Sequence, residues 1–314
     1  MTTLGAWIGV DVSKKFLDVA TTTKALARVA NEEGERRALA LRLKSEGVRG
    51  VIVEATGGLE RAILEALAAE GVAASIVNPA RVRKFAEGTG QLAKTDRLDA
   101  EILARYGEYM RPAPTVLADA HRQNLRELIG YRAQIVQEIT ARSAQVRGYL
   151  APDLKARAQA AIASLRAESK ALEKEIVSLI RLREDMRVVF KRLTTMPGVG
   201  VIVAATLIAE MPEIGSLSRA KIAALAGVAP FPKDTAERKG YRAIRGGRAD
   251  VRQALYNAAR VAIRHNPPAK ALYERLRAKG KSHKVAMVAV MRKLLTILNA
   301  MVHQNRRWNP PLTT

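Results

Sequence analysis

The chain has 314 residues, 48% of them hydrophobic, which allows two or three domains with buried cores and excludes a disordered chain. It contains no cysteine, so disulfides and cysteine-based zinc sites are excluded, as expected for a cytosolic protein. Its formal net charge is +23, and no apolar run reaches the roughly 20 residues of a membrane span, so the sequence indicates neither a membrane protein nor a signal peptide.

The first 110 residues predict a mixed α/β layer, because three short strands are followed by alternating helices and strands. We expect strands at 6–12, 16–22, 25–30, 50–56 and 73–79. We expect helices at 34–47 and 58–71, a further helix after residue 79, and a last one at 94–110.

The stretch "RPAP" at 111–114 predicts a domain boundary, and residues 111–190 beyond it are expected to be helical. Apolar residues there follow a seven-residue spacing, which predicts a long antiparallel, coiled-coil-like helical pair. Such a pair serves as a spacer or as a dimerisation element, and we favour dimerisation. The apolar positions are Leu125, Ile129, Val136, Ile139, Val146 and Leu150 on the first helix, and Leu165, Leu172, Ile176 and Leu179 on the second.

Residues 191–314 predict an all-α domain. Its "PGVG" turn, with Gly198 and Gly200, resembles a helix-hairpin-helix, which presents backbone N–H groups to a phosphate; an ordinary helix–helix turn is the alternative. A short helix at 218–227 precedes a polar, glycine-rich loop at 228–248. Helices are expected at about 249–265 and 281–304.

The excess positive charge is confined to the second part of the chain. Residues 1–110 hold 16 basic and 15 acidic side chains, whereas residues 111–314 hold 37 and 15. A polyanion is the natural partner of such a surface, and nucleic acid is favoured over a membrane or a merely soluble basic surface. Aromatic residues make up only 4%, so phosphate contacts rather than base stacking are expected to dominate binding.

Four carboxylates in the first domain are not placed like surface charges. Asp11 interrupts the apolar strand "WIGVDV", Glu54 closes the strand "GVIVEAT", and Asp96 and Asp99 share one face of a predicted helix. A carboxylate in a buried sheet is costly unless it is paired or bound to metal. We therefore expect a four-carboxylate site for Mg²⁺ or Mn²⁺, the ions that all-oxygen ligands suit.

Asp96 and Asp99 could instead form salt bridges to Lys94 or Arg97. We also regard these two cations as nucleic-acid-binding candidates. Two metal ions in such a site would activate a nucleophile and stabilise the leaving oxygen in phosphoryl transfer.

The motifs "IGVDVSKKFLDVA", "VIVEATGG", "AKTDRLDA" and "PGVG…AGVAPF…GGR" resemble, in this order and over nearly the whole chain, the DEDD transposases of insertion-sequence family 110/1111. The resemblance implies an RNase H-like domain of the Holliday-junction-resolvase type, a coiled coil and a C-terminal transposase domain. It also implies that Asp11, Glu54, Asp96 and Asp99 are the DEDD tetrad. It further implies a bacterial protein that acts at the nucleoid, guided by a non-coding bridge RNA that pairs with donor and target DNA.

In that family the loop after "AP" carries a serine that attacks DNA, usually followed by glycine, whereas this chain has Thr235 and Ala236. A threonine hydroxyl can be a nucleophile, although its methyl group crowds the attack. The other interpretations are a serine once present at 236 and since replaced, an inactive copy, or a plain phosphate-binding loop. Candidate phosphate ligands are Lys233, Arg238, Lys239, Arg242, Arg245, Gly246, Gly247 and Arg248.

We therefore predict an RNA-guided DNA recombinase that acts as a dimer or tetramer. The alternatives are a Holliday-junction-type nuclease that uses water and no guide RNA, and a non-catalytic nucleic-acid scaffold. A sugar-kinase-like ATPase is disfavoured, because "SKK" lacks the usual glycine and threonine of its phosphate loop.

Overall fold

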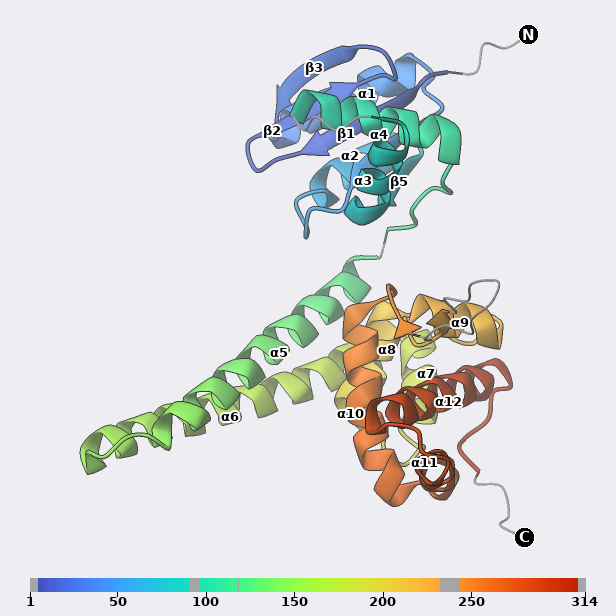
Figure 1. The fold of residues 1–314 in the computed structure, drawn as a ribbon. Coiled ribbons are helices and arrows are strands. Elements are labelled where there is room, and N and C mark those ends of the chain that lie inside the picture. Colours follow the sequence, from blue (N-terminus) through green and yellow to red (C-terminus); the bar gives the residue numbers. More distant parts are fainter. Residues whose placement is uncertain (1–4, 91–95, 118, 232–242, 310–314) are drawn as a thin grey trace. The chain divides into compact units, whose positions relative to one another are not determined.

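The computed structural model describes residues 5–90, 96–117, 119–231 and 243–309. The chain divides into two compact units, Met1–Leu117 and Ala118–Thr314 (Figure 1). Each unit has its own hydrophobic core, and each is described separately below.

The first unit is built on a five-stranded mixed sheet with the strand order β3-β2-β1-β4-β5. Strands β1 to β3 form an antiparallel meander, and β1, β4 and β5 run parallel. This topology confirms the predicted mixed α/β layer and fits an RNase H-like domain. The strands are β1 (Trp7–Val12), β2 (Phe16–Ala20), β3 (Ala25–Ala30), β4 (Gly50–Glu54) and β5 (Ala74–Val77).

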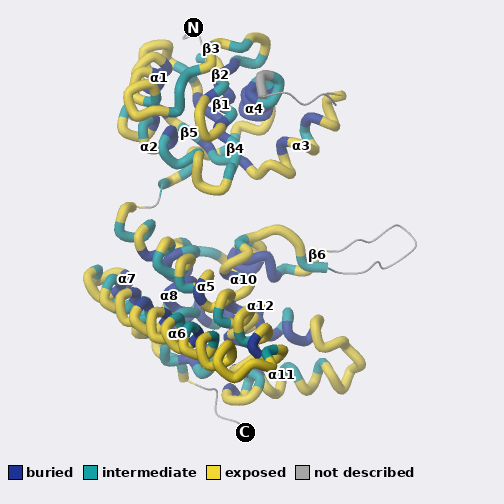
Figure 2. Tube along the Cα trace, turned by 90° about the vertical axis from the view of Figure 1, so that its left-hand side faces the viewer, coloured by how far each residue is buried: buried dark blue, intermediate teal, exposed yellow. Residues whose placement is uncertain are grey.

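Helices cover both faces of this sheet, so its central strands are buried on both sides (Figures 1 and 2). Alternate residues of β1 and β4, such as Val10 and Val53, join the core that contains α1 and α2. The opposite face, which includes Ile52, packs against α3 and α4. These helices are α1 (Glu33–Ser45), α2 (Arg61–Ala69), α3 (Pro79–Gly88) and α4 (Asp96–Met110).

The second unit begins with two long helices, α5 (Ala120–Val146) and α6 (Pro152–Arg181). They lie antiparallel, because Arg132 of α5 pairs with Glu173 while His121, nearer the start of α5, reaches the carbonyl of Leu179. The predicted helical pair is therefore present.

The apolar face of α5 differs in part from the predicted seven-residue pattern. Val136 is 37% exposed, whereas the neighbouring Ile135 is 2% exposed, and Leu150, which lies beyond the end of α5, is 96% exposed. The seven-residue spacing itself holds through Leu125, Arg132, Ile139 and Val146. The prediction omitted Arg132, because this seam position is polar and forms an ion pair with Glu173.

The remainder of the second unit is a helical bundle around one large core. Its helices are α7 (Glu184–Leu193), α8 (Val201–Glu210), α9 (Arg219–Leu225), α10 (Ala249–His265), α11 (Pro267–Ala278) and α12 (His283–His303). Helix α12 is long and apolar enough to cross a membrane, but nine of its residues are buried within this bundle. It is the central core helix.

Two features of the bundle were missed from the sequence. Helix α11 follows α10 directly, because the Asn266 side chain accepts a hydrogen bond from the N–H of Ala269 and two prolines occupy the first turn. Within the predicted loop 228–248, the two-residue strands β6 (Pro230–Phe231) and β7 (Ala243–Ile244) pair antiparallel. The segment 232–242 between them lies outside the described residues.

Candidate active site and nucleic-acid interface

The ends of β1 and β4 bring Asp11 and Glu54 to the same edge of the sheet. The parallel register pairs Val10 with Val53, and the two carboxylates are the next residues on their strands. Residues paired in this way point to the same face. Neither carboxylate is fully buried: both are intermediate in exposure.

Helix α4 lies against this face and runs antiparallel to β1. A Cβ atom at Gly9 would lie 2.6 Å from the backbone nitrogen of Ala104, and one at Gly107 would lie 2.7 Å from Cγ1 of Ile52. The N-terminal turn of α4 therefore lies toward the carboxyl ends of β1 and β4. Asp11 shares the face of Gly9, and Glu54 shares the face of Ile52, so both residues are on the side that α4 covers.

Asp99 lies at the start of α4, one turn before the fully buried Leu103. Position 96 is the first residue of the helix, one turn before Ala100, but its side chain is outside the described set, as is that of Arg97. The strand register and the direction of α4 together bring Asp11, Glu54 and Asp99 to one edge of the sheet. The first residue of α4, position 96, lies at the same edge.

Among the side chains that the structure describes, no group of three or more His, Asp or Glu residues lies close enough to hold a metal ion. Asp11, Glu54 and Asp99 each have interaction partners of their own. A metal site at this edge thus depends on Asp96 together with the other three carboxylates. All four would offer oxygen ligands, which is the donor set of Mg²⁺ or Mn²⁺.

Asp18 is a further carboxylate beside this edge that sequence analysis missed. It lies directly opposite Asp11 in the β1–β2 pair, on the same face. Its charge is balanced by Arg28, whose Nε and Nη2 donate to the two carboxylate oxygens at 2.8 and 2.9 Å. The sequence signal was a pair of opposite charges, Asp18 and Arg28, on two strands of a predicted hairpin, where the register places them side by side.

The loop after Glu54 is fixed by Glu60. One carboxylate oxygen accepts hydrogen bonds from the N–H of Thr56 (3.1 Å), the hydroxyl of Thr56 (2.8 Å) and the N–H of Gly58 (2.8 Å). Partial burial favours the neutral form, but these hydrogen bonds outweigh it and lower the pKa of Glu60. Gly57 and Gly58 both have positive φ angles, so the loop uses the conformational freedom of glycine at the point where β4 ends.

In the second unit, Gly198 is required for close packing against α10. Its φ is +102°, and a Cβ atom there would lie 2.8 Å from the carbonyl oxygen of Ala258. Gly200 precedes α8 as its N-cap, is exposed and has open space around it. Phosphate binding at this turn stays a prediction that rests on Gly200 and the first N–H groups of α8.

The base of loop 232–242 is held by two glycines in contact. Gly227 and Gly247 both have positive φ, and a Cβ atom at Gly247 would lie 2.5 Å from Cα of Gly227. Arg252 reinforces the junction by donating to the carbonyl of Gly246 at 2.7 Å. This contact explains why the "AGVAPF" and "GGR" motifs occur together, and it brings β6 and β7 side by side.

The predicted phosphate ligands near this base have different environments. Arg245 is exposed and lies over the ring of Phe231, 5.3 Å from its centroid. Arg248 instead makes a two-pronged ion pair with Glu213, with both N–O distances 2.7 Å. Burial raises the pKa of Glu213, but the hydrogen bond from Arg248 and the backbone outweigh it and lower the value. Arg248 is therefore an anchor of the loop base.

Gly246 and Gly247 are exposed at this base. The remaining candidates of the loop, and Lys94 in the first unit, lie outside the described residues; those of the loop are Lys233, Thr235, Arg238, Lys239 and Arg242.

Comparison with known proteins gives two family matches, and the first extends beyond the first unit into the second. Residues 8–152 match the model of IS110-type DEDD transposases, described as "Transposase", and residues 190–274 match the model described as "Transposase IS116/IS110/IS902 family". The first match contains the sheet edge with its carboxylates, and the second contains the glycine contact and all of α10.

Relatives with assigned names are similar over different lengths. The pilin gene-inverting protein of Moraxella bovis is 27% identical over 96% of both chains. The 43.6 kDa protein of insertion element IS110 from Streptomyces coelicolor is 29% identical over 64% of this chain and 50% of its own. The 42 kDa protein of IS900 from Mycobacterium paratuberculosis is 34% identical over 49% of this chain and 40% of its own. The chain thus belongs to the IS110 family of insertion-sequence transposases and is a DNA transposase/recombinase.

Proposed function

We propose that this transposase is an RNA-guided DNA recombinase whose DEDD tetrad is Asp11, Glu54, Asp96 and Asp99. The observation that supports the tetrad most directly is the direction of α4, which starts at the sheet edge where Asp11 of β1 and Glu54 of β4 lie. Carboxylates that converge at one edge repel one another unless cations balance them. A functional cation site is the simplest reason to place them there.

The tetrad would hold Mg²⁺ or Mn²⁺, since its four side chains offer only oxygen donors. When bound, such ions neutralise charge on the scissile phosphate and favour deprotonation of the attacking hydroxyl. The chain's own residues orient this site. Arg28 balances the neighbouring Asp18, and Glu60 fixes the loop that follows Glu54.

Thr235 is our candidate nucleophile. Its hydroxyl oxygen would attack the phosphorus of one DNA strand, the bond from phosphorus to the leaving deoxyribose oxygen would break, and that oxygen would gain a proton. The covalent phosphoester conserves the bond energy, so a second deoxyribose hydroxyl can reverse the step on a new strand without ATP. The loop that carries Thr235 is held at its base by the contact between Gly227 and Gly247.

Basic residues around this loop would bind the scissile strand. Arg245 is exposed at the loop base, whereas Arg248 acts through its ion pair with Glu213. The other proposed contacts are Lys94, Arg97, Gly198, Gly200, Lys233, Arg238, Lys239, Arg242, Gly246 and Gly247.

The partners that we propose are donor DNA, target DNA and a guide RNA. The tetrad and Thr235 lie in different units of the chain, so they can meet within one protomer or between two. We propose the second arrangement, in a dimer or tetramer joined through α5 and α6, because cleavage would then wait for complete assembly. The protein would act in the bacterial cytoplasm, at the nucleoid. The Moraxella bovis relative is named for inverting a pilin gene, and we propose DNA strand exchange as the activity of this chain as well.

The first experiment purifies the full chain without nuclease treatment and sequences the RNA that stays bound. A single structured RNA with segments complementary to DNA is the expected result, and only mixed cellular RNA would overturn RNA guidance. DNA substrates designed from that RNA then test the chemistry. Wild type should form a covalent protein–DNA adduct that Thr235→Val does not form, whereas cleavage without an adduct would indicate a water-dependent nuclease.

Mixing a tetrad variant with a Thr235 variant tests assembly between protomers. Asp11→Asn mixed with Thr235→Val should regain activity, because one intact tetrad and one intact loop are then available in the same complex. Continued inactivity of the mixture would contradict the arrangement between protomers.

A further inference from the structure

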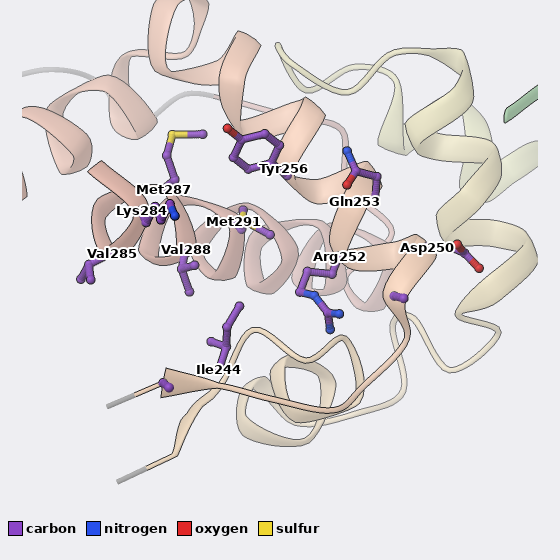
Figure 3. Close-up of a pocket in the computed structure, with 12 residues that line it drawn as sticks. Ile244, Asp250, Arg252, Gln253, Tyr256, Lys284, Val285, Met287, Val288 and Met291 are labelled. Carbon is purple, nitrogen blue, oxygen red and sulfur yellow. The ribbon is translucent and has the colours of Figure 1, made fainter. Parts of the chain in front are cut away.

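A groove along α10, lined by none of the tetrad residues or proposed phosphate ligands, has the chemistry of a site for a single nucleic-acid strand. Its first part is a cavity of about 800 Å³ between α10, α12 and β7. Figure 3 shows Met287, Met291 and Val288 of α12 across from Arg252, Gln253 and Tyr256 of α10. The cavity therefore has an apolar wall and a polar wall, as a nucleobase requires.

A second cavity of about 440 Å³ lies along the same helix, and Tyr256 lines this cavity as well. Its lining also includes Arg260, Arg264 and His265 of α10 and His283 of α12. The hydroxyl of Tyr273 is 2.8 Å from Nδ1 of His283, which orients the His283 ring. No single stretch of sequence shows this arrangement, because the lining residues come from α10, α12 and β7.

The basic and aromatic residues of α10 form one stripe. Arg252, Tyr256, Arg260 and Arg264 follow one another at intervals of four residues, which corresponds to steps of about 6 Å and a length of about 18 Å. Tyr256, Arg260 and Arg264 are exposed on this stripe. Lys284 adds a further cation from α12. Among the described residues, Asp250 is the one carboxylate that lines either cavity, and it lies at the opposite end of α10 from Arg264.

We propose that this groove binds an unpaired stretch of the DNA substrate, with one base stacked on Tyr256 and the following phosphates bound by Arg260 and Arg264. Tyr256 is 37% exposed and lines both cavities, so its ring is accessible to a base. Bases within a duplex are already stacked on one another, so this ring would select a separated strand. Arg252 is excluded from the phosphate contacts, since it already bonds the carbonyl of Gly246.

This inference rests on the proposed function, because strand exchange requires separated strands. The chain has few aromatic residues, so base stacking in this groove would depend on a single tyrosine, Tyr256. The groove borders β7 and thus the base of the loop that carries Thr235. A strand held there would lie beside the loop that we propose to attack it.

The test measures binding of the full chain to a fluorescently labelled 15-nucleotide oligo-dT and to a 15-base-pair duplex, in EDTA so that no cleavage occurs. Tyr256→Ala should weaken oligo-dT binding by about fivefold to a hundredfold, the effect of losing one base–aromatic stack, and change duplex binding by less than about twofold. Tyr256→Phe, which keeps the ring, should bind like wild type. Tyr131→Ala removes an exposed tyrosine of α5 and serves as the matched control.

A second measurement does not depend on Tyr256. The double variant Arg260→Gln/Arg264→Gln should reduce the salt dependence of oligo-dT binding by about 1.4 in the slope of log K against log[salt], or about 0.7 per phosphate contact. Equal loss of oligo-dT and duplex binding in Tyr256→Ala, or an unchanged slope in the double variant, would overturn the proposal. Oligo-U of the same length is measured in the same way. If Tyr256→Ala weakened binding of oligo-U and left oligo-dT binding unchanged, the groove would be assigned to RNA, which would overturn its assignment to DNA.

Failure of this proposal is distinguishable from failure of the proposed function. The binding assay needs neither metal nor catalysis, whereas the recombinase proposal is tested by adduct formation and by tetrad variants. A protein that binds oligo-dT as expected but forms no adduct would contradict only the recombinase proposal. A protein that forms the adduct but does not depend on Tyr256 for oligo-dT binding would contradict only the groove proposal.

Discussion

The packing of α4 on β1 determines whether the carboxylates meet, and Gly9→Ala tests it. Gly9 faces α4, and an added Cβ atom would lie 2.6 Å from the nitrogen of Ala104 and 2.8 Å from Cβ of Leu103. Real Cβ atoms essentially never approach other atoms within 3.0 Å. Two of the blocking atoms, the carbonyl oxygen of Ala100 and the nitrogen of Ala104, belong to the backbone of α4, so the whole helix must shift away from the sheet.

The cost follows from the geometry. Inserting one methyl group into a packed core typically costs about 1–3 kcal/mol. The contacts here are with a helix backbone rather than with a flexible side chain, so we expect about 3 kcal/mol or more. In a unit of this size that loss lowers Tm by about 10 °C. The shift of α4 should also separate Asp99 from Asp11 and abolish DNA cleavage at temperatures where the variant is still folded.

The assay is thermal unfolding followed by circular dichroism, with Gly34→Ala as the matched control. Gly34 lies in the first turn of α1, is exposed and has open space around its Cα. Alanine there should leave Tm unchanged or raise it slightly, because alanine favours the helix. If Gly9→Ala melts like Gly34→Ala and cleaves DNA normally, α4 does not pack on β1 as described.

Three further predictions concern stability and its pH dependence. Glu213→Gln should lower the free energy of unfolding of the second unit by about 1–3 kcal/mol, measured in urea, since Arg248 loses its charged partner. The control is Glu87→Gln at an exposed helical ion pair, which should cost less than about 0.5 kcal/mol. Gly198→Ala should lower Tm by several degrees because its Cβ atom would meet the carbonyl of Ala258, whereas Gly130→Ala, with open space on α5, should not. The pKa of Glu60 is lower in the folded state than in the unfolded state. Its contribution to stability is therefore present above the unfolded-state pKa and disappears as the pH falls through the folded-state pKa. Glu60→Gln should remove this part of the acid dependence of unfolding, and an unchanged acid profile would contradict the role of Glu60.

Much of the first unit could be predicted from its sequence, because period-two apolar strands and glycine-terminated helices are local signals. The placement of Asp11 and Glu54 at strand ends was visible for the same reason. The direction of α4 was not, since it depends on the packing of Gly9 and Gly107 against residues distant in the chain. The partnership of Asp18 and Arg28 was missed because it requires the hairpin register.

The second unit was less predictable. Polar Arg132 in the seam of α5 displaced the expected apolar positions, so that Ile135 rather than Val136 is buried. The role of Arg248 differs from a simple phosphate ligand because Glu213, 35 residues earlier, supplies its counter-charge. The groove along α10 depends on α12, and no local pattern in the sequence indicates that these helices meet around Tyr256.

The most direct test of the account is DNA cleavage in Mg²⁺ by the RNA-loaded protein with single carboxylate substitutions. Asp11→Asn, Glu54→Gln, Asp96→Asn and Asp99→Asn should each reduce strand cleavage by at least a hundredfold without changing DNA affinity more than about twofold. Glu65→Gln, at an exposed ion pair of α2, should cleave like wild type. Cleavage at the wild-type rate by any of the four tetrad variants would contradict the assignment of that carboxylate, and activity in all four would refute the proposed catalytic site.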